Sequence, residues 1–370
     1  MPIPSFLHAP IVAAAALLAL PVAGYAGHAG APATARSADA FEIRSGVTGR
    51  DYLVSIARPR LPAPATGYPV LYVPADDAAF RDLAGAVHGG GKPVLVVGIG
   101  YPQGVDPGKA GRLDLTPSVS VEPPKDSGTG GAEDFLDVIE RQLKPEIAGR
   151  FQIDREKQTL FGRSCAGLFA LYALVNAPAS FDTFVAVNPA IAFENRFLAE
   201  PQLRGRLGPK LQATQATPRV LLITDARTST PPCESRPADT REFHEFLQSL
   251  AGISSEFVGL AGTATEWASP VIRHALGTGL ARPQPAAKLA PPGAPGGIAV
   301  PTADEYRAMN AEQRYALRLR VRSLPKDQRE VWTQQFNTSL SAGLTYRQHR
   351  RFYEERVAMD QLHGTRSPDD

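Results

Sequence analysis

Residues 159–170 have the pattern of a strand that stops, a tight corner with a lone serine, and a helix that begins at once. An apolar run ends at Gly162, and the small residues Ala166 and Gly167 follow Ser164. Small residues suit a corner where the backbone passes close to itself, and a helix N-terminus offers free N–H groups to an oxyanion. Ala166 stands at the second glycine of the G-x-S-x-G pattern. The segment is therefore either a nucleophile corner or an ordinary strand–turn–helix.

Strands and helices alternate on both sides of this corner. Residues 93–99 are a continuous apolar run, which is typical of a buried parallel strand. Apolar residues within 132–148 recur on one helical face. The alternation predicts an α/β fold with a mostly parallel central sheet and helices on both faces. The expected strands are 52–57, 69–73, 93–99, 158–161, 183–187, 219–224 and 255–260, and the expected helices are 77–87, 132–148, 240–250 and 270–280, with a polar loop over 113–131.

Composition limits the partners of the chain. Its 370 residues are 43% apolar and 21% charged, as in a globular protein, and the formal charge of +2 gives no reason to expect nucleic-acid or membrane binding. A phosphate-binding loop needs a helix with characteristic residues directly after its glycines. Neither the glycines at 89–91 nor those at 98 and 100 are followed by one, so we expect turns there and no nucleotide binding. The histidines are scattered and neither cysteine has a partner at ligand spacing, so we expect no metal and no cofactor.

The N-terminus has the pattern of an export signal. Residues 11–22 are an apolar core too short to span a bilayer, and small residues follow it. We expect a signal peptide over 1–26, cleaved after Ala26, and a spacer over 27–40. Because residues 1–10 contain no Lys or Arg, an uncleaved anchor is the alternative. The expected location is the periplasm or the exterior.

The chain changes character after the expected α/β domain, which covers residues 41–281. Residues 282–301 are rich in Pro and Gly and form a semi-stiff linker. A helical extension follows over 302–370. Its helix signals are a capping box that begins at Thr302, a helix boundary at Pro325, and a cap at Thr345.

Three arginines share one face of the first long helix of this extension: Arg314, Arg318 and Arg322. No acid lies among them on that face. The face is either solvated or a docking surface for a protein or envelope partner.

Seven short segments follow one another along the chain as landmarks. They are SGVTGRDY at 45–52, YPVLYV at 68–73, VVGIGYP at 96–102, RLDLTP at 112–117, GGAEDFL at 130–136, LKP at 143–145 and LFGRS at 160–164. Taken together and in order, they resemble the esterase-D-like α/β-hydrolases, which include siderophore trilactone esterases of the enterobactin-hydrolase type. The resemblance covers about residues 40–280 and leaves the extension outside. It implies the α/β-hydrolase fold, with residues 45–52 as the opening strand.

The family resemblance implies ester hydrolysis with Ser164 as the nucleophile. It also implies that the oxyanion is held by the backbone N–H of Cys165 and by N–H groups of the loop after the strand 69–73, at Ala75 and Asp76. The family has Asp-Gly in that loop, whereas this chain has no glycine there. Loss of the glycine constrains the turn.

The general base is the largest departure from the family. Aligning the family segment around its catalytic histidine places Thr265 at the histidine position. A serine hydroxyl needs a base with a pKa near neutrality, and threonine has none. The candidates are His274, on the helix that follows, and Glu266, as a carboxylate base. A base from the extension or from a partner is a further alternative.

The loop after the strand 219–224 is where an α/β-hydrolase carries its acid. Asp225 is the best placed carboxylate, with Glu234 and Asp239 as alternatives. Cys233 lies in the same loop, and Cys165 directly follows the candidate nucleophile. In an oxidising compartment the two cysteines form either one disulfide across the site or two unpaired thiols.

Two functions are consistent with these residues. The first is an exported serine esterase that acts on a small-molecule ester, siderophore-like or another acyl ester. The second is a non-catalytic binding or assembly protein with a degenerate hydrolase fold, favoured by Thr265 and by the added extension. Labelling and mutation of Ser164 separate the two.

Overall fold

The computed structural model describes residues 39–74, 77–118, 128–193, 198, 204–225, 233–260, 266–287 and 295–364. The expected signal peptide, most of the spacer, Ala75, Asp76 and Thr265 lie outside the described residues. Within the described part, no helix is both long enough and apolar enough to cross a membrane.

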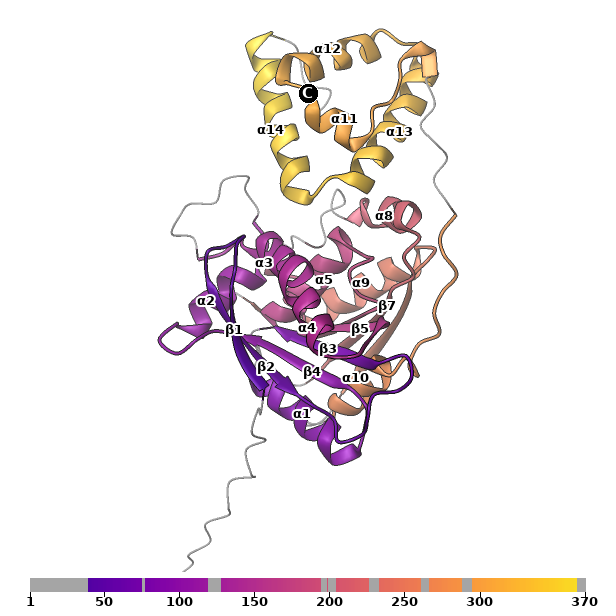
Figure 1. Ribbon diagram of the computed structural model, residues 1–370. Helices are drawn as coiled ribbons and strands as arrows, with labels where there is room; N and C mark the ends of the chain where they lie inside the picture. The colour runs from indigo at the N-terminus through magenta and orange to yellow at the C-terminus, as the bar shows by residue number, and fades with distance from the viewer. Residues whose placement is uncertain are drawn as a thin grey trace, which may run out of the picture. The chain divides into compact units, whose positions relative to one another are not determined.

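Eight strands form one sheet in the order β1-β2-β4-β3-β5-β6-β7-β8 (Figure 1). The strand β2 pairs antiparallel with β1 and β4, and all other neighbours pair parallel. This arrangement confirms the mostly parallel sheet. The strands are β1 (Asp39–Arg44), β2 (Asp51–Ala57), β3 (Tyr68–Pro74), β4 (Leu95–Gly100), β5 (Ile153–Arg163), β6 (Thr183–Val187), β7 (Arg219–Thr224) and β8 (Ser254–Gly259).

Helices cover both faces of the sheet, as predicted, because the central strands are apolar on both sides (Figure 1). One face packs against α1 (Asp77–Gly90) and α10 (Ala268–Ala275). The other face packs against the other helices of the domain that the structure describes. These are α2 (Pro107–Leu115), α3 (Ala132–Val138), η1 (Ile139–Leu143), α4 (Lys144–Arg150), α5 (Cys165–Asn176), α8 (Leu207–Thr214) and α9 (Pro237–Gln248).

The expected opening strand over 45–52 is wrong. The strand β1 ends at Arg44, and a turn occupies 45–50 before β2 begins. The Ser45 N–H donates to the Arg50 carbonyl at 2.8 Å, and the Ser45 hydroxyl accepts from the Thr48 N–H at 2.9 Å. A serine hydroxyl that bonds the backbone three residues on favours a turn over a strand.

Three smaller expectations are also corrected. The polar loop expected from residue 113 begins inside α2, which Asp106 caps by accepting from two backbone N–H groups. The expected helix 132–148 is continuous but passes through one π-helical turn, η1. Gly98 and Gly100 lie in β4 and not in turns. A Cβ at Gly98 would lie 2.8 Å from the Phe80 ring, so the glycine lets α1 approach the sheet.

The helical tail, residues 295–364, has two apolar clusters of its own. Capping boxes begin α11 at Thr302 and α14 at Thr345, and Pro325 separates α12 from α13, as predicted. A third box, at Asn310, begins α12 and is absent from the prediction. The elements are η3 (Pro295–Gly297), α11 (Ala303–Ala308), α12 (Ala311–Arg322), α13 (Lys326–Gly343) and α14 (Tyr346–Leu362).

The arginine face of α12 is covered within the chain. Arg314 forms a two-armed ion pair with Glu355 of α14, with both N–O distances at 2.7 Å. Arg318 pairs with Asp360 of the same helix at 2.9 Å. The expectation of a solvated face is therefore wrong for Arg314 and Arg318, which α12 uses to pack against α14. A partner-docking surface on the tail stays a prediction.

Candidate active site

The corner at Ser164 has the geometry of a nucleophile elbow. The strand β5 ends at Arg163, and α5 begins at Cys165. Ser164 lies between them at φ 55° and ψ −116°, a conformation that non-glycine residues rarely adopt. A Cβ at Gly162 would lie 1.9 Å from the Ala166 carbonyl oxygen, so only glycine fits there.

Backbone hydrogen bonds fix this corner to the neighbouring strand. The Ser164 N–H donates to the Val187 carbonyl at 3.0 Å, and the Ala190 N–H donates to the Ser164 carbonyl at 3.3 Å. The Leu168 N–H donates to the same Ser164 carbonyl at 3.0 Å and closes the first turn of α5. The elbow is therefore held by its own main chain.

The Ser164 side chain contacts the loop that follows β7. Its Oγ donates a hydrogen bond to the backbone carbonyl of Cys233, at 3.0 Å. Cys233 is bridged to Cys165 by a disulfide, with the two Cα atoms 5.2 Å apart. Of the two alternatives for the cysteines, the structure contains the disulfide, and the bridge joins the first residue of α5 to the loop that carries the expected acid.

Asp225 lies at the end of β7 and is held by a residue that sequence reasoning missed. The Asn188 Nδ2 donates to Asp225 Oδ1 at 2.5 Å, and the Asp225 N–H donates to Asn188 Oδ1 at 3.0 Å. Both residues are buried. Asn188 follows β6 directly at φ 45°. A polar residue between an apolar strand and Pro189 is the one signal that the sequence offered for it.

His274 has partners other than Ser164. Its Nδ1 lies 2.8 Å from the Pro270 carbonyl oxygen and its Nε2 lies 3.3 Å from Glu256 Oε2. The side chain is fully buried, and burial lowers the pKa of the imidazole below its usual range. These contacts place the ring between α10 and β8. The structure does not bring His274 to Ser164.

The other histidines within the described residues also have contacts elsewhere. Two of the seven in the chain, His8 and His28, lie outside the described residues. The described part therefore shows no imidazole in contact with the Ser164 hydroxyl. The remaining four are His88 on the Arg58 carbonyl, His244 on the Ser255 hydroxyl, His349 beside Arg206 and Lys210, and His363 stacked on Tyr315.

Glu266 is exposed and lies in the turn before α10. The Trp267 ring that follows it stacks on Phe161 of β5, with the ring centroids 5.1 Å apart. This contact anchors the start of α10 against the strand that leads to Ser164. Thr265, which immediately precedes Glu266, lies outside the described residues, as do the expected oxyanion donors Ala75 and Asp76. Among the described residues, no three His, Cys, Asp or Glu side chains gather closely enough to hold a metal ion.

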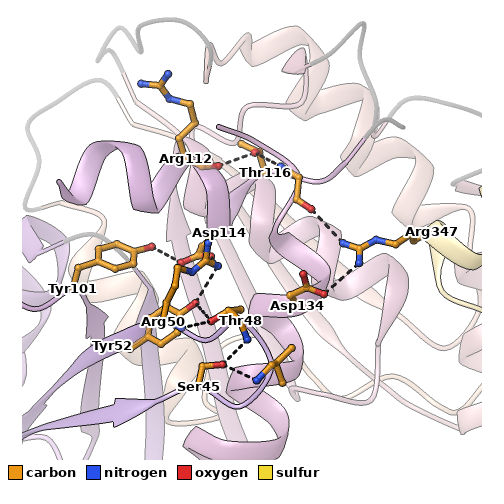
Figure 2. Close-up of polar contacts among 12 residues, drawn as sticks. Ser45, Thr48, Arg50, Tyr52, Tyr101, Arg112, Asp114, Thr116, Asp134 and Arg347 are labelled. Carbon is orange, nitrogen blue, oxygen red and sulfur yellow. Dashed lines mark hydrogen bonds and ion pairs between the residues drawn. The ribbon is translucent and has the colours of Figure 1, made fainter. Parts of the chain in front are cut away.

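A buried polar cluster explains the RLDLTP landmark (Figure 2). Asp114 is fully buried; it accepts from the Tyr101 hydroxyl at 2.9 Å and pairs with the Arg50 guanidinium. Burial raises the pKa of the Asp114 carboxyl to about 6, although Arg50 opposes this shift. Tyr52 also contacts Arg50, at 3.2 Å. The cluster ties the turn before β2 to the end of β4 and to α2.

Comparisons with known proteins agree with this geometry. A family model described as "Putative esterase" matches residues 45–220. The ferri-bacillibactin esterase of Bacillus subtilis is 36% identical over 164 residues, which are 40% of this chain and 57% of the relative. The siderophore triacetylfusarinine C esterase of Aspergillus fumigatus is 40% identical over 124 residues, 33% of this chain and 41% of the relative. The chain thus spans about half the length of the curated relatives it matches.

A solved structure extends the similarity to about two thirds of the chain. The BES protein of Bacillus cereus is 30% identical, with a TM-score of 0.53, and the match covers 65% of this chain and 93% of that one. The fold is therefore the α/β-hydrolase fold that the landmarks implied. The chain belongs to the esterase family.

Proposed function

We propose that the chain hydrolyses carboxylic esters of the siderophore type through an acyl-enzyme on Ser164. The observation that carries this proposal is the Ser164 elbow, at φ 55° before the N-terminus of α5, within a chain of the esterase family. The relatives named above are esterases of ferri-bacillibactin and of triacetylfusarinine C. An apolar run over residues 11–22 supports export to the periplasm or the exterior.

In the proposed reaction, Ser164 Oγ attacks the ester carbonyl as its proton passes to the base, and the alcohol leaves with that proton. The Cys165 N–H, at the start of α5, is one oxyanion donor, and the loop with Ala75 and Asp76 supplies the second. Water then attacks the acyl-enzyme and releases the acid. Asp225 is proposed as the carboxylate that supports catalysis from the end of β7, because Asn188 holds one of its oxygens in place.

The proposed proton acceptor is Glu266. It directly follows Thr265, the residue at the family's histidine position, and its side chain is exposed. His274 was the other candidate, but its two ring nitrogens face Pro270 and Glu256. Glu266→Gln should lower kcat by about two or more orders of magnitude, while His274→Gln should leave kcat within a few fold.

The deciding experiment is labelling of the purified protein with a fluorophosphonate, with the modified residue mapped by mass spectrometry. A fluorophosphonate reacts with a serine whose hydroxyl is activated. We expect labelling at Ser164 and none in Ser164→Ala, and we expect wild type alone to hydrolyse a trilactone siderophore. Turnover by Ser164→Ala at the wild-type rate would refute Ser164 as the nucleophile.

A second candidate function is favoured by one observation. The Ser164 hydroxyl is bonded to a backbone carbonyl, and the described residues place no imidazole beside it. A carbonyl oxygen accepts a hydrogen bond but does not take up the proton. The alternative is therefore a siderophore-binding protein without turnover. Quenching of protein fluorescence by the siderophore, with neither hydrolysis nor fluorophosphonate labelling, would establish it.

A further inference from the structure

Cys233, in the loop after β7, contacts both Ser164 and the residue that follows it. The backbone carbonyl of Cys233 accepts the Ser164 hydroxyl proton in a hydrogen bond, at 3.0 Å, and the Cys233 side chain is bonded to Cys165. Cys165 is the next residue after Ser164. The acceptor for the serine is thus covalently attached to the neighbour of the serine.

The main chain of the elbow does not need this bridge. Ser164 is fixed through the carbonyl of Val187, the last residue of β6, and the N–H of Ala190, in the connection that follows. Gly162 permits the close approach at the corner. Loss of the disulfide therefore leaves the Ser164 backbone in place and releases Cys233, together with the carbonyl that holds the hydroxyl.

A serine side chain has three staggered positions for Oγ, and a free hydroxyl exchanges among them. The hydrogen bond to Cys233 selects one position and polarises the O–H bond. Cys233 is 3% exposed, so water competes little for its carbonyl. The bridge holds this acceptor at one place, because it ties Cys233 covalently to the first residue of α5.

We propose that Cys233 is a positioning residue for the Ser164 nucleophile: its carbonyl, anchored by the disulfide, holds Oγ in the rotamer that attacks the ester. The hydroxyl proton turns from this carbonyl to Glu266 when the base takes it up. This inference rests on the proposed function. It makes the reactivity of Ser164 dependent on the redox state of the bridge, so that the oxidised protein is the competent form.

The redox step needs a dithiol such as dithiothreitol. The S–S bond breaks, each cysteine sulfur gains one hydrogen, and the dithiol loses two hydrogens to become a cyclic disulfide. Cys165 is half-buried and Cys233 is buried. The chain contains two cysteines in all, so the reagent acts at one place.

The test is the rate of fluorophosphonate labelling at Ser164 before and after reduction by dithiothreitol. We expect the rate constant to fall at least about tenfold on reduction and to return on reoxidation. The double variant Cys165→Ala/Cys233→Ala is the matched control: it should label as slowly as reduced wild type, and the dithiol should not change its rate. For an ester substrate, kcat should fall while KM stays the same.

A purely structural role for the bridge predicts a different result. In that case reduction would slow labelling only by unfolding part of the protein. The fall in labelling rate would then equal the loss of folded protein that the unfolding curve shows. An unchanged or faster rate in folded, reduced protein would overturn the proposal.

If Ser164 labels in neither state, the proposed esterase function fails, and amide hydrogen exchange decides the positioning claim. Faster exchange on reduction over residues 233–240, with residues 166–176 unchanged, would support the anchoring of Cys233. Unchanged exchange over residues 233–240 would refute it.

Discussion

The Ser164 elbow and the helical tail are held together by different kinds of contact. The elbow depends on close approach of main-chain atoms at Gly162 and on backbone hydrogen bonds to Val187. The tail depends on charged pairs between helices, such as Arg314 with Glu355, over two small apolar clusters. The elbow should therefore be sensitive to the size of a side chain, and the tail to charge and pH.

The two tryptophans of the chain report on the two regions separately. Trp267 is 1% exposed and lies in the core beneath β5, whereas Trp332 is 4% exposed and lies in the tail. A Trp332→Phe background leaves fluorescence from the core alone. A Trp267→Phe background leaves fluorescence from the tail alone.

The largest expected effect is at Gly162. In Gly162→Ala the new Cβ meets the Ala166 carbonyl oxygen at 1.9 Å, and that oxygen belongs to the main chain and cannot turn aside as a flexible side chain could. We expect a loss of about 4 kcal/mol or more in the free energy of unfolding, or no folded core. The measurement is urea unfolding followed by Trp267 fluorescence. Gly149→Ala is the matched control, because its Cβ meets nothing within 4 Å on α4, and it should stabilise by up to about 1 kcal/mol. Equal stabilities for the two variants would refute this account of the elbow.

The second effect is at Arg314, which is 8% exposed and bonded through both arms to Glu355. Arg314→Ala leaves the half-buried Glu355 carboxylate without this partner, which should cost about 2 to 4 kcal/mol in the tail. Trp332 fluorescence should show earlier unfolding, while Trp267 fluorescence should not change. Arg320→Ala is the control, because Arg320 is exposed on the same helix. If Trp267 and Trp332 fluorescence showed the same loss of stability in Arg314→Ala, the tail and the core would unfold as one unit.

The elbow and the Arg314 ion pair also show which features of the fold can be predicted from the sequence. Gly162 and the capping box at Thr302 act within a few residues, so local pattern was enough to predict the corner and the helix start. The pairing of Arg314 with Glu355 spans 41 residues, and the sequence around Arg314 shows only a basic face. The face was therefore interpreted as solvated or partner-binding, although its partner lies in α14.

The same distinction applies within the candidate site. The strands that end near Ser164 and Asp225 were predicted from apolar runs, and β6 and β7 have the predicted bounds. The contact between Asn188 and Asp225 spans 37 residues and that between Ser164 and Cys233 spans 69. Both depend on the order of strands in the sheet, which no local pattern encodes. The sequence left two candidates for the base, His274 and Glu266, because the contact of His274 with Glu256 also joins separate elements of the chain.

The third effect is a pH dependence at His349, where the tail meets α8. Arg206 bonds the Leu344 carbonyl, and His349 lies one turn into α14. Burial, with the nearby charges of Arg206 and Lys210, lowers the pKa of His349 to about 4 from its usual 6.5. The folded state therefore favours the neutral ring.

The sign of the effect follows from this shift. Stability from His349 is fully present above about pH 6.5 and is lost as pH falls through 4, because the unfolded chain binds the proton more readily. The loss is at most about 3 kcal/mol. Trp332 fluorescence should show the tail loosening in acid, and His349→Gln should remove that transition. If His349→Gln showed an acid transition of the same size, groups other than His349 would be responsible for the loosening of the tail.

The smallest effect tests whether charge also matters where the tail meets α3. Arg347 bonds Asp134 at 3.3 Å and the Gly130 carbonyl at 3.4 Å (Figure 2). Its side chain is one-third exposed, so water and salt screen the pair. Arg347→Ala should cost less than about 1 kcal/mol in the tail, and the cost should shrink between about 0.05 M and about 0.5 M NaCl. A cost that is unchanged by salt would mean that Arg347 acts through packing of its aliphatic stem. The contrast between a size-sensitive elbow and a charge-sensitive tail would then not hold at this contact.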